Sequence, residues 1–448
     1  MIYGFILLIV LSACFILAYN ITKDLFSPIC FFSFLQILRY VPYLIGRNYE
    51  SLTFLTLNYE NTFLTFVFEL LTIISIMVGY LFYQSFSSNR INQKYYSLST
   101  KYYKNSHIII LFVLGMIGRL RVISFVGGLS AILSNGAEAY LKLSDGTGYL
   151  YLLSDCTILA CVMQLSNIIQ LLEKKKKTFK STMVLVFMFL LYSASFVVFT
   201  SRSPILELLL YLIFSWHYCR KKITFKSILN INFLLIGLFF AIVIVILPRI
   251  RASFYNSSSN ISGGNFISEF FDQFTYVGRD TFVYNLFGRK YDFWYGKSYQ
   301  GLFTSFIPST FYPGKPTVDD GVYLTNLLYG YSFDVPTSGD ALTIKYSIPF
   351  STSGLAYANF GVLGIIIVNF FLGILYGVAY NRAKKSKNVI FITIYILIIY
   401  QLEITTLSIV QTAMPAFIFI TYYFIFGRQR KPDFSIINNY SLKKGDCS

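Results

Sequence analysis

Charged residues are scarce in this sequence. Asp, Glu, Lys and Arg make up 13% of its 448 residues, whereas a typical soluble domain has about 25%. Hydrophobic residues make up 55%, and the mean hydropathy is +0.60. This composition argues against a soluble domain and predicts an all-α polytopic membrane protein.

Acidic residues are the scarcer charged class, with 20 Asp and Glu against 37 Lys and Arg and a net charge of +17. On a soluble chain this excess would indicate nucleic-acid binding. Here most Lys and Arg stand in short clusters between apolar runs, and such clusters set the topology of a membrane protein. We therefore expect no nucleic-acid partner.

Histidine is nearly absent, and the two that are present, His107 and His217, lie outside the long segment 249–354. That segment therefore has no histidine to act as a general base or to bind a metal. The six cysteines show no zinc-site spacing. The sequence predicts no metal site, no cofactor and no disulfide framework.

Long apolar runs fill most of the chain. A membrane-spanning helix takes about 20 mostly apolar residues. The sequence predicts eleven spans, at 2–20, 26–46, 62–84, 107–126, 148–172, 182–200, 204–219, 227–248, 355–379, 389–403 and 410–427. The chain is thus expected to comprise spans one to eight (1–248), a large loop (249–354), spans nine to eleven (355–427) and a tail (428–448).

Every second loop is basic, namely those that follow spans three, five, seven, nine and eleven. Basic loops stay in the cytoplasm, so the N-terminus is predicted outside and the C-terminus inside. The same alternation places the large loop outside. Its two amphipathic stretches, 265–277 and 319–330, predict a partly helical cap on the outer membrane surface.

A charged residue inside a predicted span costs about 2.5–3.5 kcal/mol on insertion and is a candidate functional residue. Six candidates belong to the outer half of the membrane: Arg39, Glu69, Arg119, Arg121, Glu207 and Glu403. Arg39 and Glu69 share a depth on consecutive helices and are predicted to form a structural ion pair. The shared depth suggests a polar cavity with excess positive charge, suited to an anion. The alternative is a set of ion pairs near helix ends, with long side chains reaching the interface.

The turn in SFVVFTSRSPILELLL carries Arg202 on the predicted outer side, against the topology rule. Ser203-Pro204 is a favourable helix start. The free N–H groups and positive dipole end of that helix then face outward. We predict that Arg202 contacts a phosphate or pyrophosphate there. The alternative is a capped turn whose arginine faces lipid phosphates.

Three stretches resemble bacterial oligosaccharide repeat-unit polymerases of the O-antigen polymerase (Wzy) type: FTSRSPILELLL, YGKSYQGLFTSFIPSTFYPGKP and SGLAYANFGVLGIIIVNFFLGILYG. The resemblance implies a multi-pass protein of the bacterial cytoplasmic membrane, similar to GT-C type glycosyltransferases. It implies metal-independent joining of polyprenyl-pyrophosphate-linked repeat units, on the path to O-antigen of lipopolysaccharide, capsule or exopolysaccharide. The implied partners are the lipid-linked oligosaccharide, a chain-length regulator and a flippase.

The negative charge that develops on a leaving pyrophosphate calls for preorganised cations. The residues proposed to contact it are Arg202, Arg119, Arg121, Arg249, Arg251, Arg279 and Lys315. Asp280 or Asp319 is proposed to orient the acceptor hydroxyl. An O-antigen ligase, a flippase or exporter of lipid-linked sugars, and a receptor remain alternatives. The ligases use a histidine in the loop, and transporters usually have short outer loops and internal repeats.

Overall fold

The structure is a computed structural model of the chain. It describes residues 2–44, 62–88, 102–125, 127–128, 148–197, 203–228, 277–307, 311–330, 332–337, 347–348, 350–386 and 388–427, with 230, 235, 237–238, 241–242 and 245–246. Within these residues the only β pairing is two isolated bridges. The prediction of an all-α protein is therefore confirmed.

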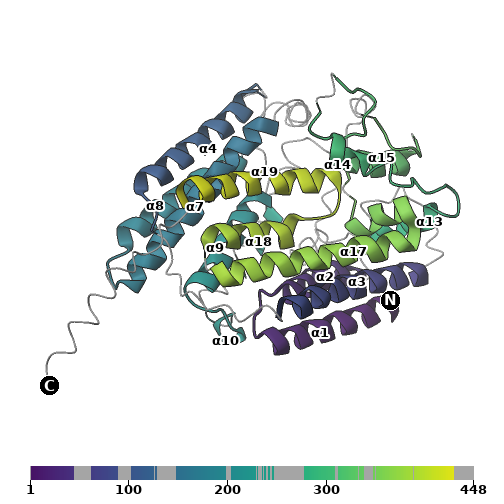
Figure 1. Ribbon diagram of the computed structural model, residues 1–448, viewed down its shortest axis with the longest axis horizontal. Coiled ribbons are helices and arrows are strands. Elements are labelled where there is room, and N and C mark those ends of the chain that lie inside the picture. The colour runs from purple at the N-terminus through teal and green to yellow at the C-terminus, as the bar shows by residue number, and fades with distance from the viewer. Residues whose placement is uncertain are drawn as a thin grey trace.

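Fourteen α-helices and one short π-helical turn make up the described part of the chain (Figure 1). They are α1 (Ile2–Thr22), α2 (Pro28–Leu44), α3 (Thr62–Ser88), α4 (Asn105–Phe125), α7 (Gly148–Glu173), α8 (Phe179–Val197), α9 (Ser203–Cys219), α10 (Phe225–Ile228), α13 (Val277–Leu286), α14 (Gln300–Thr304), α15 (Gly321–Tyr329), α17 (Thr352–Ser386), α18 (Val389–Gln401), α19 (Thr406–Tyr422) and the π turn η2 (Tyr423–Gly427).

Ten of the eleven predicted spans coincide with helices, and the eighth, 227–248, lies largely outside the described residues. Within the described residues, six helical segments are long and apolar enough to cross a membrane: α1, α3, α4, α7, α17, and α19 together with η2. Four apolar helices, α2, α8, α9 and α18, are shorter. The chain thus has the helices of a membrane protein, and the total of eleven spans stays a prediction.

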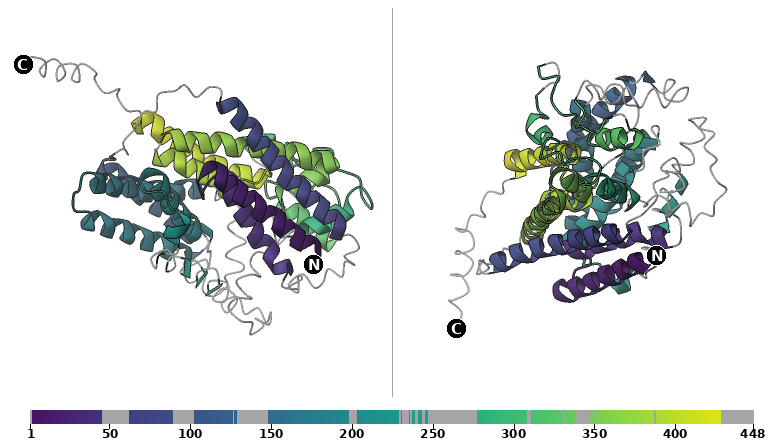
Figure 2. Two further views of the ribbon diagram at one scale, coloured as in Figure 1. Left: turned by 90° about the horizontal axis from the view of Figure 1, so that it is seen from below. Right: turned by 90° about the vertical axis from the view of Figure 1, so that its right-hand side faces the viewer.

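The helices form two groups joined by the C-terminal helices (Figures 1 and 2). In one group α1 and α2 pack together and α17 runs along α3; in the other α4 packs along α7, with α8 and α9 beside it. Helix α18 contacts both α17 and α9. A continuous core that includes Tyr80, Met163, Tyr211 and Tyr395 therefore joins the two groups.

Glycines let α3 and α17 touch backbone to backbone. A Cβ atom added at Gly79 would lie 2.0 Å from the carbonyl oxygen of Phe370, and one at Gly373 would lie 2.1 Å from that of Ile76. Small residues at such contacts are typical of helix pairs in membranes, where close van der Waals packing drives association. This contact fixes the position of α17 against α3.

Helix α17 is interrupted at Gly361, whose φ of 62° and ψ of −146° are not helical. The large loop pairs with the backbone just before this break. The N–H groups of Trp294 and Tyr295 donate to the carbonyls of Ala358 (2.9 Å) and Asn359 (3.0 Å). Irregular backbone at membrane depth is tolerated where protein groups satisfy it. The first part of α17 is consequently covered by the loop.

The loop also contributes aromatic side chains to a second hydrophobic core, which it shares with α3 and α17. Tyr284, Phe287, Trp294 and Tyr323 are buried in one cluster with side chains of α3 and α17. The predicted amphipathic stretch 319–330 contains α15, whose buried residues include Val322, Leu324 and Leu327; the other stretch, 265–277, lies almost wholly outside the described residues. The described loop is therefore packed into the end of the helix bundle.

Candidate functional site

Buried polar side chains gather where α2 ends and where α3, α13 and α17 begin. Glu69 on α3 is buried and accepts hydrogen bonds from the hydroxyls of Tyr40 (2.7 Å) and Tyr284 (3.4 Å). These donors come from α2 and α13. A buried carboxyl with two phenolic donors is well satisfied, so Glu69 is a fixed member of this cluster.

Asp280 lies in the first turn of α13 and is buried beside Glu69. The hydroxyl of Ser351 donates to its Oδ1 at 2.6 Å. A Cβ atom at Gly354 would lie 2.7 Å from the same oxygen. Burial and the negative charge of Glu69 raise the pKa of Asp280 to about 8. Asp280 can therefore exchange a proton near neutral pH.

Arg39 and Glu403 form the exposed edge of this first cluster. Arg39 Nη2 lies 3.5 Å from Glu403 Oε1, and the two side chains are 31% and 33% exposed. The other carboxylate oxygen of Glu403 accepts the backbone N–H (2.7 Å) and the hydroxyl (2.5 Å) of Thr352, at the start of α17. A carboxylate in this position complements the positive end of the helix dipole. Through this edge the cluster reaches the protein surface.

In the structure, Arg39 and Glu69 have other direct partners than the ion pair predicted between them. Arg39 pairs with Glu403, while tyrosine hydroxyls hold Glu69. The charges of Arg39 and Glu69 also interact. The depth estimated from the sequence placed both residues in the same layer, but it gave no information on Glu403, which comes from the connection between α18 and α19.

A second buried cluster lies between α4, α7, α8, α9 and α18. Buried Arg119 points to the carbonyl of Ser195, with Nη2 at 3.4 Å. Glu207 accepts hydrogen bonds from the Tyr211 hydroxyl and, at 3.1 Å, from Gln401 Nε2. Asp155 on α7 interacts electrostatically with Glu207. The cluster thus combines one arginine with two carboxyls.

The end of α18 links the two clusters. Gln401 bonds to Glu207 in the second cluster, and Glu403, two residues later, bonds to Thr352 and Arg39 in the first. The connection between them is short and is held by Ser408, whose Oγ donates to the carbonyl of Gln401 (2.6 Å) and accepts the N–H of Glu403 (2.7 Å). The two clusters therefore form one polar layer across the bundle.

The remaining predicted residues do not enter this layer together. Arg121 is exposed, two residues from buried Arg119. Arg279 is half-buried at the start of α13. Lys315 is buried, and its Nζ donates to the carbonyls of Ile307 and, at 3.4 Å, Thr304.

Asp319 serves a turn: its Oδ1 accepts the N–H of Gly321 (2.9 Å) and the hydroxyl of Ser347 (2.7 Å). Its neighbour Asp320 accepts the N–H of Leu407 (2.9 Å) at the start of α19. Arg202, Arg249 and Arg251 lie outside the described residues, so their predicted role stays a prediction.

The excess positive charge expected in the polar layer is not found among the described residues. The layer contains Arg39 and Arg119 against the carboxyls of Glu69, Asp155, Glu207, Asp280 and Glu403. Sequence reasoning missed Asp155, although it interrupts the apolar run YLYLLSDCTILACVM and the same rule of charges within spans would have found it. The described layer is consequently better suited to proton exchange than to binding an anion by itself.

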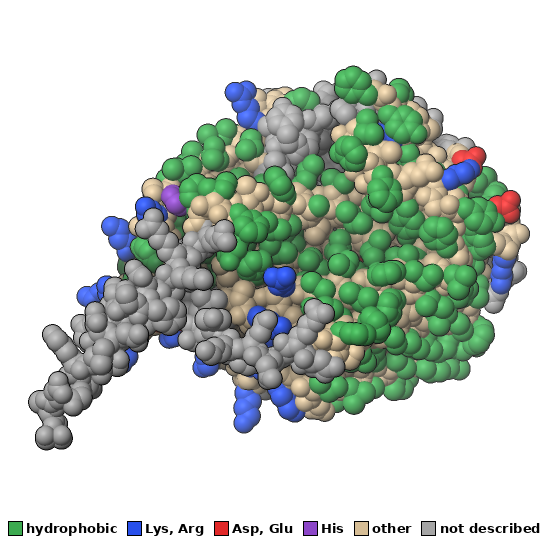
Figure 3. Space-filling model, viewed as in Figure 1, with side chains coloured by type: hydrophobic (Ala, Val, Ile, Leu, Met, Phe, Trp, Pro, Cys, Tyr) green, Lys and Arg blue, Asp and Glu red, His purple; other side chains and the backbone are tan. Residues whose placement is uncertain are grey.

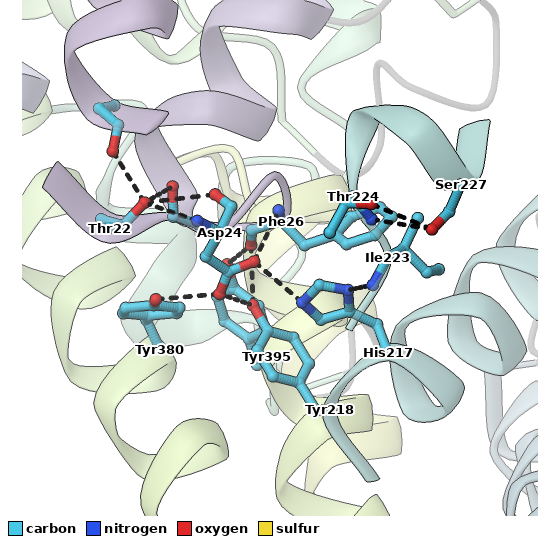
Figure 4. A network of polar contacts seen from close by, with 12 residues as sticks. Thr22, Asp24, Phe26, His217, Tyr218, Ile223, Thr224, Ser227, Tyr380 and Tyr395 are labelled. Atoms are coloured by element: carbon cyan, nitrogen blue, oxygen red, sulfur yellow. Dashed lines mark hydrogen bonds and ion pairs between the residues drawn. The ribbon is translucent and has the colours of Figure 1, made fainter. Parts of the chain in front are cut away.

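A third network lies at the opposite end of the bundle (Figure 4). Asp24, in the connection between α1 and α2, accepts hydrogen bonds from His217 Nε2, the Tyr218 and Tyr380 hydroxyls and the Phe26 N–H, all at 3.0 Å. Burial raises the pKa of Asp24, but the hydrogen bonds, that from His217 foremost, outweigh it, and the pKa lies below its usual value. Because Asp24 has four donors from three parts of the chain, it ties α9 and α17 to the α1–α2 connection.

Comparison with known protein families, with curated proteins and with solved structures finds no match to this chain. Among the described residues, no three His, Cys, Asp or Glu side chains are placed to hold a metal ion. The polar layer therefore has to be interpreted from its own chemistry.

Proposed function

We propose that this protein polymerises polyprenyl-pyrophosphate-linked oligosaccharide repeat units at the outer face of the bacterial cytoplasmic membrane. The observation that carries the proposal is the Asp280 carboxyl of the loop, which is buried next to Glu69 and accepts the hydroxyl of Ser351. Burial and the charge of Glu69 raise its pKa to about 8. A general base is most effective when its pKa lies near the working pH. A sugar hydroxyl is a weak nucleophile that needs such a base.

In the proposed reaction an acceptor hydroxyl of one repeat unit attacks the anomeric carbon of the donor chain. The new glycosidic C–O bond forms as the bond to the pyrophosphate breaks. Asp280 takes the hydroxyl proton, and polyprenyl pyrophosphate leaves with the bonding electron pair. Arg279, next to Asp280 in the chain, and Arg119 and Arg202 are proposed to stabilise the charge on the leaving group.

The sequence features support the same proposal. The outer placement of the large loop follows from the basic loops, and the loop packs against the start of α17, close to Asp280. A lipid-linked substrate would reach the layer from the membrane, and the edge formed by Arg39 and Glu403 is accessible. A chain-length regulator and a flippase are the proposed partners.

The substitution Asp280→Asn tests the proposal. It keeps the size and hydrogen-bonding capacity of the side chain but removes the base. In cells that depend on this protein for polymer, we expect polymerisation to fall by about 10²–10⁴-fold at unchanged protein level. Asp292→Asn, an exposed acid of the same loop, is the matched control and should leave polymer length unchanged. Full-length polymer from the Asp280 variant would exclude Asp280 as the base.

A further inference from the structure

Four aromatic side chains of the large loop are almost fully exposed. Tyr295, Phe303, Phe306 and Phe311 are between 73% and 83% exposed. We call these four residues the aromatic patch. Other aromatics of the same loop, such as Tyr284, Trp294 and Tyr323, are buried. Among the described residues of the loop, the four most exposed aromatic side chains thus fall within one short stretch of sequence.

The segment that carries the patch packs against α17 and against the start of α19. Tyr299 stacks on Phe360 of α17, with ring centroids 6.0 Å apart and planes 11° apart. A Cβ atom at Gly301 would lie 2.8 Å from Thr406 Oγ1, in the first residue of α19. Phe360 is eight residues into α17, about 12 Å along the helix. The patch therefore stands beside the ends of apolar helices.

A buried lysine holds the stretch in shape. Lys315 Nζ donates to the carbonyls of Thr304 and Ile307, on either side of the turn that presents Phe306. Burial lowers the pKa of Lys315. The exposed aromatics are thus carried on backbone that is fixed from within.

The stretch of sequence that carries the patch has no acidic residue. No acidic residue stands between Asp292 and Asp319, while Lys297 is exposed within that stretch. On α17 and α19 the apolar side chains of Leu363 and Phe417 are each 67% exposed. Figure 3 shows hydrophobic side chains running over α17 and α19 and on to the region of α14. The patch therefore continues the apolar surface of these helices.

We propose that the aromatic patch is an interfacial anchor that dips into the outer leaflet of the membrane. Aromatic side chains favour the headgroup level of a bilayer, and apolar residues flanked by a cation bind the boundary between headgroups and acyl chains. The occupant is bilayer lipid, with Lys297 facing its phosphates. The anchor holds the loop against the membrane whatever reaction the protein performs, so it does not rest on the proposed function.

Nitroxide labelling of the full chain in lipid nanodiscs tests this proposal. A label is placed at Phe306→Cys after Cys219→Ser and Cys447→Ser, in discs of phosphatidylethanolamine and phosphatidylglycerol. Leu363→Cys is the reference inside the bilayer and Lys290→Cys, exposed in the same loop, is the reference in water. We expect the ratio of oxygen to nickel-chelate accessibility at position 306 to be several-fold above that at position 290 and to approach that at position 363.

Two results would overturn the proposal. The first is a ratio at position 306 equal to that at position 290, which would place the patch in water. The second is a water-like ratio that rises only after polyprenyl phosphate is added, which would make the substrate chain the occupant in place of bilayer lipid. A Phe303→Cys label read in parallel guards against a local effect of the Phe306 substitution. Because Phe303 and Phe306 are both exposed, neither label disturbs the packed core.

Discussion

Two arginines that stand two residues apart on α4 have opposite surroundings. Arg119 is buried and reaches α8, whereas Arg121 is exposed. Successive positions two apart on a helix point to nearly opposite sides, so only Arg119 faces the polar layer. Gln401, the last residue of α18, and Glu403, in the connection that follows, contact different clusters.

This difference predicts unequal effects of substitution. Arg119→Ala removes a buried cation from the layer and should lower polymerisation by roughly 10²–10³-fold, the usual loss for one preorganised electrostatic group. Arg121→Ala should cause a much smaller loss. The measurement is polymer length and yield at matched protein levels. Equal losses for the two variants would contradict the role given to Arg119.

The raised pKa of Asp280 predicts a pH dependence. A general base must be ionised to act, so activity should increase from about pH 6 to about pH 9 as the Asp280 carboxyl loses its proton. The free energy of unfolding should change in the opposite direction and decrease as pH rises. The pKa is higher in the folded protein than in the unfolded chain, so the stabilisation is complete below the unfolded value and is lost as pH rises through about 8. Initial rates and thermal unfolding over the same pH range check both.

At the residue scale, the sequence predicts some members of the polar layer but not others. Composition and hydropathy located Arg119, Glu207 and Glu403 within the layer, because a charge in an apolar run is conspicuous. The tyrosines that hold Glu69 could not be recognised, since Tyr40 and Tyr284 are two among many aromatic residues. Lys315 was assigned to substrate because of its charge, but its burial against backbone carbonyls depends on the turn of the loop.

At the scale of elements, the contact between α3 and α17 depends on glycine. In Gly373→Ala the new Cβ would lie 2.1 Å from the carbonyl oxygen of Ile76, so the helices must separate. Overpacking of this kind costs about 1–3 kcal/mol, and we expect a lower unfolding temperature in detergent.

Gly237→Ala is the matched control, since Gly237 is helical and nothing lies within 4 Å of a Cβ there. Alanine favours a helix over glycine by up to about 1 kcal/mol, so this variant should be as stable as the wild type or more so. A Gly373 variant that unfolds no earlier than the Gly237 variant would show that the backbone contact contributes nothing.

The positions of the helices were predictable, but their pairing was not. Apolar runs of about 20 residues reveal a span whatever its neighbours are, and ten predicted runs are helices. The pairing of α17 with α3 joins residues almost 300 positions apart, as in the contact of Gly373 with Ile76. The interruption of α17 at Gly361 likewise depends on loop N–H groups from far earlier in the chain.

At the scale of the whole molecule, buried polar groups lie at both ends of the helix bundle, and the two sets have different roles. In the Asp24 network, the carboxylate accepts hydrogen bonds from side chains of α9 and α17 and so ties these helices to the α1–α2 connection. The layer at the other end couples two carboxyls, Glu69 and Asp280, next to an accessible edge. The basic loops of the sequence predict that the first end faces the cytoplasm and the second the outside. Chemistry is therefore expected at the end that carries the loop.

Reconstitution gives the most direct measurement of the proposed polymerase function. The purified protein is placed in liposomes with a synthetic polyprenyl-pyrophosphate-linked repeat unit, and the products are resolved by glycan length. A polymerase yields a ladder of longer lipid-linked glycans and releases one polyprenyl pyrophosphate for each bond formed, and Asp280→Asn lowers both by about 10²–10⁴-fold. Movement of the substrate across the bilayer without lengthening, by folded wild-type protein, would contradict polymerisation and indicate a transporter.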